Sequence, residues 1–187
     1  MNCYDFDKTI FNPDSSVLFT YYCVLHHPVA MLHSLPPTIH YGIKYLFKKT
    51  DFSTLKEKMY VFLKYLDDVD EDVKRFWDKR SSRIEKWYLN QKRDDDIIIS
   101  ASPEFLLQPV ADMLKVRLIA TKIDKHTGIM DGKNCKGEEK VKRLRLEYPD
   151  AVVDDFYSDS LSDTPMAEIA KRAFIVNKSD LKPWPNK

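Results

Sequence analysis

The chain begins with the residues MNCYDFDKTIF, which place two carboxylates one residue apart, at Asp5 and Asp7. In a strand, side chains two residues apart lie on the same face, so at the end of a strand these two converge. Converging carboxylates repel each other and require a cation, a shared proton or both. A solvated turn is the alternative, because aspartate is common in turns. The rest of the sequence has to decide between these two interpretations.

Three later segments carry chemistry that matches this pair. Ser100 follows the apolar run Ile97-Ile98-Ile99 and precedes a predicted helix, Lys140 lies early in a predicted helix over residues 137–147, and Asp159 and Asp163 follow a predicted strand over 151–157. Carboxylate oxygens suit Mg²⁺. A hydroxyl group, the amides at a helix start and an ammonium group suit a phosphate. The four segments together indicate a magnesium and phosphate site.

The predicted elements explain how these residues could meet. A short strand covers about residues 2–5, and from residue 96 onward strands alternate with helices, which is typical of an α/β domain with a mostly parallel sheet. Ligands of such sheets bind at the carboxyl ends of the strands. Residues 53–92 carry an apolar stripe at helical spacing. A capping box at Thr54 and Glu57 predicts one helix start there, Ser102 predicts another as an N-cap, and the acidic run 67–72 predicts a break.

Composition limits the classes of function. The 187 residues are 43% hydrophobic and 32% charged with a formal net charge of +1, so the chain lacks the basic excess of a nucleic-acid-binding protein. The three cysteines, Cys3, Cys23 and Cys135, show neither metal spacing nor a disulfide framework. Together with the absence of a recognisable signal peptide, they predict a cytoplasmic protein.

The four segments resemble the motifs of the haloacid dehalogenase superfamily, in the branch that includes phosphoserine phosphatase. The residues that carry the resemblance are Asp5-Phe6-Asp7-Lys8-Thr9, Ile97-Ile98-Ile99-Ser100-Ala101-Ser102, Lys140 within Cys135–Val141, and Tyr157-Ser158-Asp159-Ser160-Leu161-Ser162-Asp163. They occur in the order of that family and cover about the whole chain. The resemblance implies a three-layer Rossmann-like core with a mostly parallel sheet and an inserted α-helical cap.

The resemblance also implies roles for the acidic residues. Asp5 is the expected nucleophile, which takes the phosphoryl group as an aspartyl phosphate and binds Mg²⁺. Asp7 is the expected general acid and then base, and its backbone carbonyl is a metal ligand. Asp159 completes the protein ligands of the metal. Asp163 and Thr9 are expected to orient these groups without contacting the metal themselves.

Phosphate binding is expected from a second set of groups. The resemblance assigns it to Phe6, Ser100, Ala101 and Lys140, with the Lys140 ammonium neutralising charge that spreads over the phosphoryl oxygens. Ser100 and Lys140 therefore also count among the expected catalytic residues.

Two features of these motifs need an interpretation: two departures from the family pattern, and the spacing of the aspartates in the fourth motif. The family often has glycine at the positions of Lys8 and Ser158, which puts the rate and the substrate in doubt more than the reaction class. In the fourth motif, Asp155, Asp159 and Asp163 are equally spaced. A metal ligand must lie beyond the carboxyl end of the strand, which selects Asp159 and Asp163 and leaves Asp154 and Asp155 with a structural role.

Residues 13–93 are the expected cap, and residues 1–12 and 94–187 the catalytic core. Caps of this kind close over the site and select the substrate. Pro28 and the pair Pro36-Pro37 are expected to break residues 17–48 into short pieces. The cap histidines at 26, 27, 33 and 40 lack zinc spacing and are expected to be packed or on the surface.

The apolar residues of 17–47 are expected to be buried against the 53–92 helices. The alternative is that part of this surface, followed by Lys48 and Lys49, contacts an apolar phosphoester or the edge of a membrane.

The predicted function is a Mg²⁺-dependent phosphatase acting on a small phosphomonoester. The alternatives are a phosphotransferase or mutase that passes the phosphoryl group to another acceptor, or a phosphatase of phospholipid headgroups. A non-enzymatic binding protein on the same fold would be expected to have lost a catalytic acid, and none is lost here.

Overall fold

A computed structural model describes residues 1–185. A six-stranded sheet in the order β3-β2-β1-β4-β5-β6 forms its centre; the first five strands are parallel and β6 pairs antiparallel with β5. This confirms the predicted α/β class, while β6 was not predicted. The strands are β1 (Cys3–Tyr4), β2 (Ile97–Pro103), β3 (Arg117–Thr121), β4 (Asp155–Ser158), β5 (Arg172–Asn177) and β6 (Asp180–Pro183).

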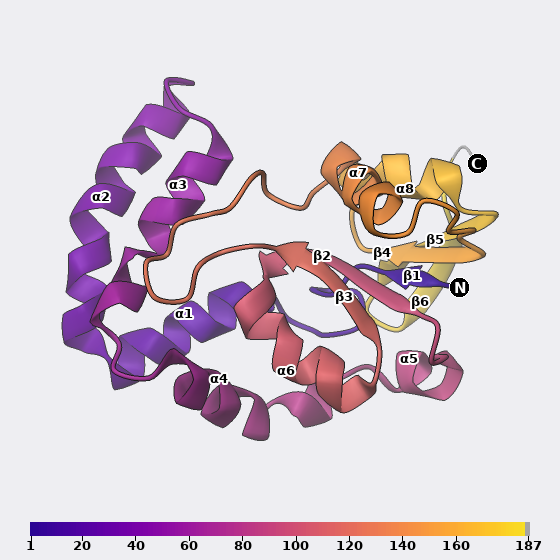
Figure 1. The fold of residues 1–187 in the computed structure, drawn as a ribbon, viewed down its shortest axis with the longest axis horizontal. Coiled ribbons are helices and arrows are strands. Elements are labelled where there is room, and N and C mark those ends of the chain that lie inside the picture. Colours follow the sequence, from indigo (N-terminus) through magenta and orange to yellow (C-terminus); the bar gives the residue numbers. More distant parts are fainter. Residues whose placement is uncertain (186–187) are drawn as a thin grey trace.

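Helices cover both faces of the sheet (Figure 1). Along β2, Ile98 belongs to one apolar cluster and Ile97 and Ile99 to another, because successive side chains point to opposite faces. The first face carries α6 (Glu104–Leu114), α4 (Val69–Asp78) and α5 (Lys86–Gln91), and the second carries α7 (Glu138–Glu147) and α8 (Thr164–Ile169). The three-layer Rossmann-like core is therefore confirmed.

The regular elements between β1 and β2 are all helices. Two of them, α2 and α3, form a hairpin that projects away from the sheet, whereas α4 packs beside α6 (Figure 1). The division into a core of 1–12 and 94–187 and a cap of 13–93 stays a prediction. The elements are α1 (Ser15–His26), α2 (Pro28–Leu46), α3 (Phe52–Met59), η1 (Val61–Tyr65), α4 (Val69–Asp78), η2 (Ser81–Arg83) and α5 (Lys86–Gln91).

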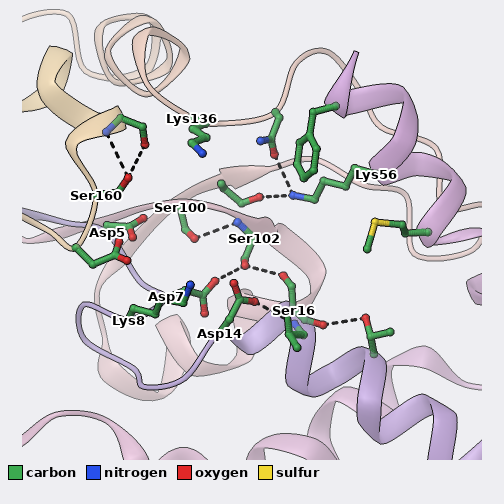
Figure 2. A pocket seen from close by; sticks show the side chains of 18 of the residues that line it. Asp5, Asp7, Lys8, Asp14, Ser16, Lys56, Ser100, Ser102, Lys136 and Ser160 are labelled. Carbon is green, nitrogen blue, oxygen red and sulfur yellow. Dashed lines mark hydrogen bonds between the residues drawn. The ribbon is translucent and has the colours of Figure 1, made fainter. Parts of the chain in front are cut away.

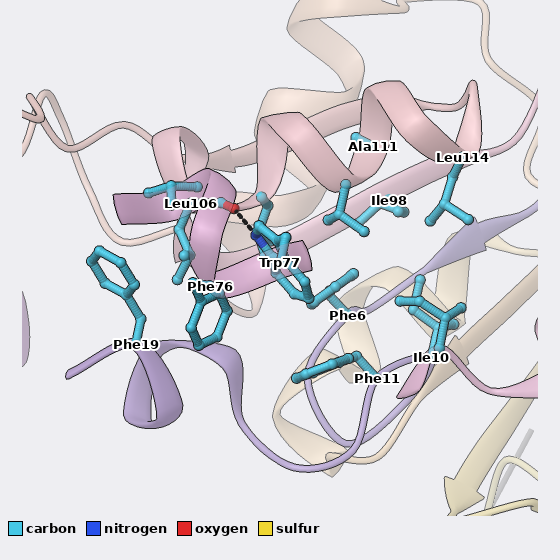
Figure 3. Close-up of a cluster of buried hydrophobic side chains, with 14 of the residues drawn as sticks. Phe6, Ile10, Phe11, Phe19, Phe76, Trp77, Ile98, Leu106, Ala111 and Leu114 are labelled. Atoms are coloured by element: carbon cyan, nitrogen blue, oxygen red, sulfur yellow. Dashed lines mark hydrogen bonds between the residues drawn. The ribbon is translucent and has the colours of Figure 1, made fainter. Parts of the chain in front are cut away.

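Aromatic packing holds α4 against the start of the core. Trp77 contacts Phe6 and Phe11 edge to face at 5.8 and 5.1 Å between ring centroids, and its Nε1 donates a hydrogen bond of 2.6 Å to the carbonyl oxygen of Leu106 (Figure 3). Because Phe6 lies between the two carboxylates of the first motif, this packing helps to fix the position of that loop.

The predicted break at Pro36-Pro37 is wrong, since both prolines lie inside α2. Each proline removes one backbone hydrogen bond from the helix. Tertiary packing compensates: α2 lies along α3 and η1, and Thr38 Oγ1 donates to the Lys58 carbonyl oxygen at 3.1 Å. Pro28 occupies the first helical position of α2, where it lacks only an amide that has no helical partner.

Two of the predicted helix starts are wrong, and one is confirmed. Asp51, rather than Thr54, caps α3 by accepting from the Thr54 amide. Ser102 lies in β2, and Pro103 is the N-cap of α6. The acidic run does separate two helices as predicted, because Asp68 caps α4 and accepts from the Glu71 amide.

The expected burial of the apolar residues between 17 and 47 is wrong for most of them. In α2, only Ala30 and Ser34 are buried, and the apolar residues of the opposite face are exposed. The side of α2 that packs on α3 and η1 carries the small residues Ala30 and Ser34. The larger apolar side chains of α2 therefore lie on the other side, which is exposed. Within residues 1–185, no helix has the length and apolar character needed to cross a membrane.

Candidate active site

The strand ends bring the predicted residues to one edge of the sheet. Strand β1 lies between β2 and β4, with Tyr4 level with Ile98 and Tyr157. The Asp5 amide continues the ladder by donating to the Tyr157 carbonyl oxygen at 2.8 Å. Asp5 and Asp159 directly follow β1 and β4, whereas Ser100, expected at a strand end, lies within the longer β2. All three residues line one cavity of about 640 Å³ (Figure 2).

Lys140 connects two of the predicted acids at the floor of this cavity. Its Nζ lies 2.6 Å from Asp5 Oδ1 and 2.7 Å from Asp163 Oδ2, and its side chain is only 1% exposed. Burial lowers the pKa of Lys140, but the two carboxylates outweigh it, so the net shift is upward and the ammonium is charged. Burial raises the pKa of Asp5 to about 7, against the opposing effect of Lys140.

Gly137 allows α7 to approach the fourth motif closely enough for this contact. Its φ of +58° is a left-handed conformation, its amide donates to Asp163 Oδ1 at 3.3 Å, and an added Cβ would lie 3.2 Å from the Ser162 carbonyl oxygen. Ser158 contributes at the same point, since its hydroxyl donates to Asp163 Oδ2 at 2.9 Å. The hydroxyl at this frequent glycine position therefore helps to hold Asp163.

The backbone conformation at Lys8 explains why the family often has glycine at this position. Lys8 has a φ of +58°, a conformation in which a side chain costs about 1 kcal/mol and glycine costs nothing. Its ammonium favours the ionised form of Asp159, whose pKa is nevertheless raised by burial. Thr9 holds the same loop, because its Oγ1 accepts from the Asp159 amide at 3.0 Å.

Asp7 is held by groups that sequence reasoning did not assign to the site. Its Oδ1 accepts from the Ser15 amide at 2.6 Å, and its Oδ2 accepts from the Ser102 hydroxyl (Figure 2). Ser102 in turn lies 2.7 Å from the Ser16 hydroxyl, so β2 and the start of α1 hold Asp7 jointly. Burial raises the pKa of Asp7 to about 6. The Ser-x-Ser spacing of Ser100 and Ser102 was the available signal.

Lys56 is a second residue that the sequence did not single out. It lies on α3 and is 8% exposed, and its Nζ donates to the Ala101 carbonyl oxygen and, at 2.9 Å, to Asn134 Oδ1. Both partners are neutral, and burial lowers the pKa of Lys56 to about 8. In an otherwise solvated helix nothing in the sequence marks this lysine as buried.

The cavity has a polar floor and an apolar wall. The floor consists of the acids, serines and lysines described above, together with Lys136 and Ser160 (Figure 2). The wall is formed by α1 and α3 through Val17, Tyr21, Val24, Phe52 and Met59. The arrangement can hold an anionic group at the floor and an apolar group against the wall.

The donor set at the floor fits a magnesium ion. No three side chains of His, Cys, Asp or Glu within residues 1–185 form a ready-made metal cluster. The expected ligands are instead two carboxylates, Asp5 and Asp159, and the backbone carbonyl of Asp7, all of them hard oxygen donors. Lys140 contacts only Oδ1 of Asp5, and none of the described hydrogen bonds or ion pairs involves the Asp159 carboxylate, so both acids retain free oxygens.

Asp154 and Asp155 lie elsewhere. Asp155 begins β4, at the opposite end of the strand from Asp159, and its oxygens accept from Arg172 at 2.6 and 2.7 Å. Asp154 pairs with the N-terminal ammonium at 2.9 Å and with Lys171 at 2.7 Å. Both have ionic partners far from the cavity floor.

The cap histidines are not grouped as metal ligands among the described residues. His27 Nε2 lies 2.9 Å from Asp72 Oδ1, and the His33 ring stacks on Tyr65 at 3.8 Å between centroids. These contacts are structural.

Comparison with known families now adds to the geometry. Residues 3–168 match the family model of the haloacid dehalogenase-like hydrolases. The chain belongs to this family. The predictions of the family and of a hydrolase are therefore confirmed. Protein CicA of Caulobacter vibrioides is 35% identical over 81 residues, which are 40% of this chain and 36% of CicA.

Solved structures of this hydrolase fold resemble the chain over most of its length. A protein of unknown function from Bordetella pertussis Tohama I superposes with a TM-score of 0.75 at 20% identity and covers 96% of this chain and 90% of its own. A phosphoserine phosphohydrolase-like protein from Francisella tularensis gives a TM-score of 0.57 at 16% identity, over 92% and 86% of the two chains. At these identities the likeness shows the fold.

Proposed function

We propose that this hydrolase is a Mg²⁺-dependent phosphatase that cleaves a phosphomonoester through an aspartyl phosphate on Asp5. The observation that carries the proposal is the buried group of Asp5, Lys140 and Asp163 on the floor of a cavity that Asp159 also lines. A structural relative named as phosphoserine phosphohydrolase-like supports a small phosphomonoester as the substrate class.

Asp5 and Asp7 divide the reaction between them. An oxygen of Asp5 attacks phosphorus while the ester bond breaks, and the leaving alcohol takes a proton from Asp7. Water then attacks the phosphorus of the aspartyl phosphate and gives its proton to Asp7. The bond from phosphorus to Asp5 breaks, and inorganic phosphate leaves. Ser102 and the Ser15 amide hold the Asp7 carboxylate during both steps.

Charge on the phosphoryl group is met by the floor of the cavity. The Lys140 ammonium, the Ser100 hydroxyl and the amides of Phe6 and Ala101 are the proposed phosphate donors. Asp163 and Ser158 fix the position of Lys140 rather than touching substrate. Mg²⁺ held by Asp5, Asp159 and the Asp7 carbonyl supplies positive charge that keeps Asp5 ionised and offsets the charge of the phosphate.

The test is release of phosphate from p-nitrophenyl phosphate with and without Mg²⁺. Asp5→Asn is expected to abolish turnover, because it removes the nucleophile and leaves the shape of the side chain unchanged. Asp155→Asn is the matched control, since Asp155 lies at the other end of β4, and its activity is expected to persist. Beryllium fluoride, which mimics a phosphoryl group on aspartate, is expected to inhibit the parent. Near-normal Mg²⁺-dependent activity in Asp5→Asn contradicts the covalent mechanism.

A further inference from the structure

The outward side of α2 is an apolar surface with no partner in the described chain. Its residues recur at spacings of three and four, which puts them on one side of the helix. Their exposed fractions run from 49% at Leu35 to 79% at Leu46. Soluble proteins rarely leave such a continuous apolar strip uncovered, and larger exposed patches usually mark interaction sites. We call this strip the outer face of α2; it consists of Val29, Leu32, Leu35, Ile39, Ile43, Leu46 and Phe47.

The charge of this region is one-sided. Residues 15–50 contain no aspartate or glutamate, three lysines and four histidines. Lys48 and Lys49 follow the end of α2, beside Leu46 and Phe47 of the outer face, which are 79% and 70% exposed. Lys44 lies in the last turn of α2, with its Nζ over the Tyr41 ring at 4.9 Å. Over the whole chain the acidic and basic residues nearly balance, at 29 and 30. The outer face therefore combines apolar surface with local positive charge, the pattern of a helix that rests on an anionic membrane.

The end of α2 also lies close to the cavity. The ring of Tyr45, which is 43% exposed near the end of α2, contacts the ring of Phe52 at 5.9 Å between centroids. Phe52 begins α3 and lines the cavity that holds Asp5 and Lys140. Leu46 and Phe47, at the end of α2 in the α2–α3 hairpin (Figure 1), are therefore exposed close to Phe52, which belongs to the apolar wall of the cavity.

From these observations we propose that the outer face of α2 and the tip of the α2–α3 hairpin dock on the surface of a bilayer with anionic lipid headgroups. The helix has 19 residues and is about 28 Å long, and it lies flat on the membrane with its buried side on α3 and η1. Lys48 and Lys49 contact the headgroups, and Leu46 and Phe47 enter the boundary with the acyl chains.

A second copy of the chain fits this surface less well. In a twofold dimer the same patch supplies both sides of the interface. Residues 15–50 offer no carboxylate to pair with the three lysines of this segment, and the next carboxylate, Asp51, already accepts from the Thr54 amide and hydroxyl as the N-cap of α3. A twofold interface would therefore bury positive charge with little compensation. An anionic lipid surface supplies the missing negative charge.

Docking also indicates a substrate class, and this step rests on the proposed phosphatase function. The wall residues Val17, Tyr21 and Val24 of α1 and Met59 of α3 are exposed between 38% and 65%, although they line a cavity. An apolar tail would cover them while the phosphate occupies the floor. The expected substrate is therefore a phosphomonoester with an apolar tail, taken from the membrane surface.

The docking test is sedimentation of the protein with vesicles of phosphatidylcholine, prepared with and without phosphatidylglycerol. The parent is expected to pellet with the anionic vesicles. The triple variant Leu32→Glu/Ile39→Glu/Leu46→Glu is expected to bind at least about a hundredfold more weakly, because it removes three apolar side chains that docking buries in the membrane. Lys48→Gln/Lys49→Gln is expected to bind about 30-fold more weakly. Leu146→Glu, at an 81% exposed leucine of α7, is the matched control and is expected to bind like the parent.

Hydrolysis of soluble p-nitrophenyl phosphate separates docking from catalysis, because none of these positions touches the floor of the cavity. The variants are expected to keep this activity, and the parent is expected to prefer phosphatidic acid in anionic vesicles to the soluble ester. If the parent hydrolyses the soluble ester but stays in the supernatant, docking is wrong and the proposed function stands. If it pellets but releases no phosphate from any ester, the proposed function is wrong and docking stands. A dimer that the triple variant dissociates, without vesicle binding, overturns the proposal in favour of a second copy.

Discussion

Replacing Lys140 by methionine tests the charge arrangement at the floor of the cavity without reference to any substrate. The side chain has a similar length but no charge. In the parent, one ammonium serves two buried carboxylates, Asp5 at 2.6 Å and Asp163 at 2.7 Å. The variant leaves both without their cation, in a region where Asp5 is 8% and Asp163 is 3% exposed.

The expected loss of stability follows from this geometry. Removing one partner of a buried ion pair costs about 3–5 kcal/mol, because the remaining charge is desolvated and unpaired. With an m-value of about 2.5 kcal/mol/M, a loss of about 4 kcal/mol lowers the urea midpoint by about 1.6 M. The measurement is urea unfolding of parent and variant followed by circular dichroism in the presence of EDTA.

A compensating variant controls for simple loss of packing. Lys140→Met/Asp163→Asn removes one of the two stranded charges and keeps the side-chain volumes. It is expected to recover more than half of the stability that the single variant loses, whereas phosphatase activity stays low in both because the Lys140 ammonium is absent. The reasoning is refuted if Lys140→Met unfolds within about 0.5 kcal/mol of the parent, or if the second substitution makes the loss larger.

Three other predictions address the metal, the cap lysine and the backbone. Asp159→Ala is expected to weaken magnesium activation at least about tenfold when activity is titrated with Mg²⁺. Asp155→Ala is expected to weaken it only slightly, because both Asp155 oxygens already accept from Arg172. Equal effects would contradict the ligand assignment. Burial lowers the pKa of Lys56 to about 8, so its ammonium is present below that pH and lost above it. The KM for a phosphomonoester is therefore expected to rise above pH 8 in the parent. In Lys56→Arg, which keeps its charge, KM is expected to stay level. Gly128→Ala is expected to lower the free energy of unfolding, measured by thermal unfolding, by more than about 2 kcal/mol, because φ is +72° and the new Cβ would lie 2.4 Å from the Tyr60 carbonyl oxygen. Gly42→Ala, where a Cβ meets no atom within 4 Å, is the control and is expected to stabilise the protein slightly.

Much of the meeting of residues at the cavity floor could be predicted because it depends on local patterns. The run Ile97-Ile98-Ile99 is apolar on both sides, and only a strand covered on both faces satisfies it. Once β1 and β2 are parallel neighbours, the residues after them must meet at one edge of the sheet. The same logic placed Asp159 beyond the strand; the strand itself was expected over 151–157, with Asp155 late in it, whereas β4 begins at Asp155. The order of the motifs then indicated the family, which the match over residues 3–168 confirms.

The helical segment was predicted less well, because its contacts are between residues far apart in the sequence. The pair Pro36-Pro37 signals a break by its own chemistry, and only packing against α3 and η1 keeps α2 continuous. Thr54 and Glu57 match a capping box, but Glu57 instead accepts from the Met130 amide at 3.0 Å. A local capping motif does not form when a residue distant in the sequence makes a hydrogen bond to the same side chain.

The sequence by itself determined which atoms could do chemistry: the carboxylates, the lysine and the serine of the four motifs, and the strand ends that carry them. Tertiary structure alone decided what surrounds them. It buried Lys56 against Ala101, turned Ser102 from a helix cap into a hydrogen-bond donor for Asp7, and left the outer face of α2 exposed. The physical reason is that strand alternation and chain order act over a few residues, whereas burial depends on which distant surfaces meet, and a helix with apolar residues on two sides does not specify which side is covered.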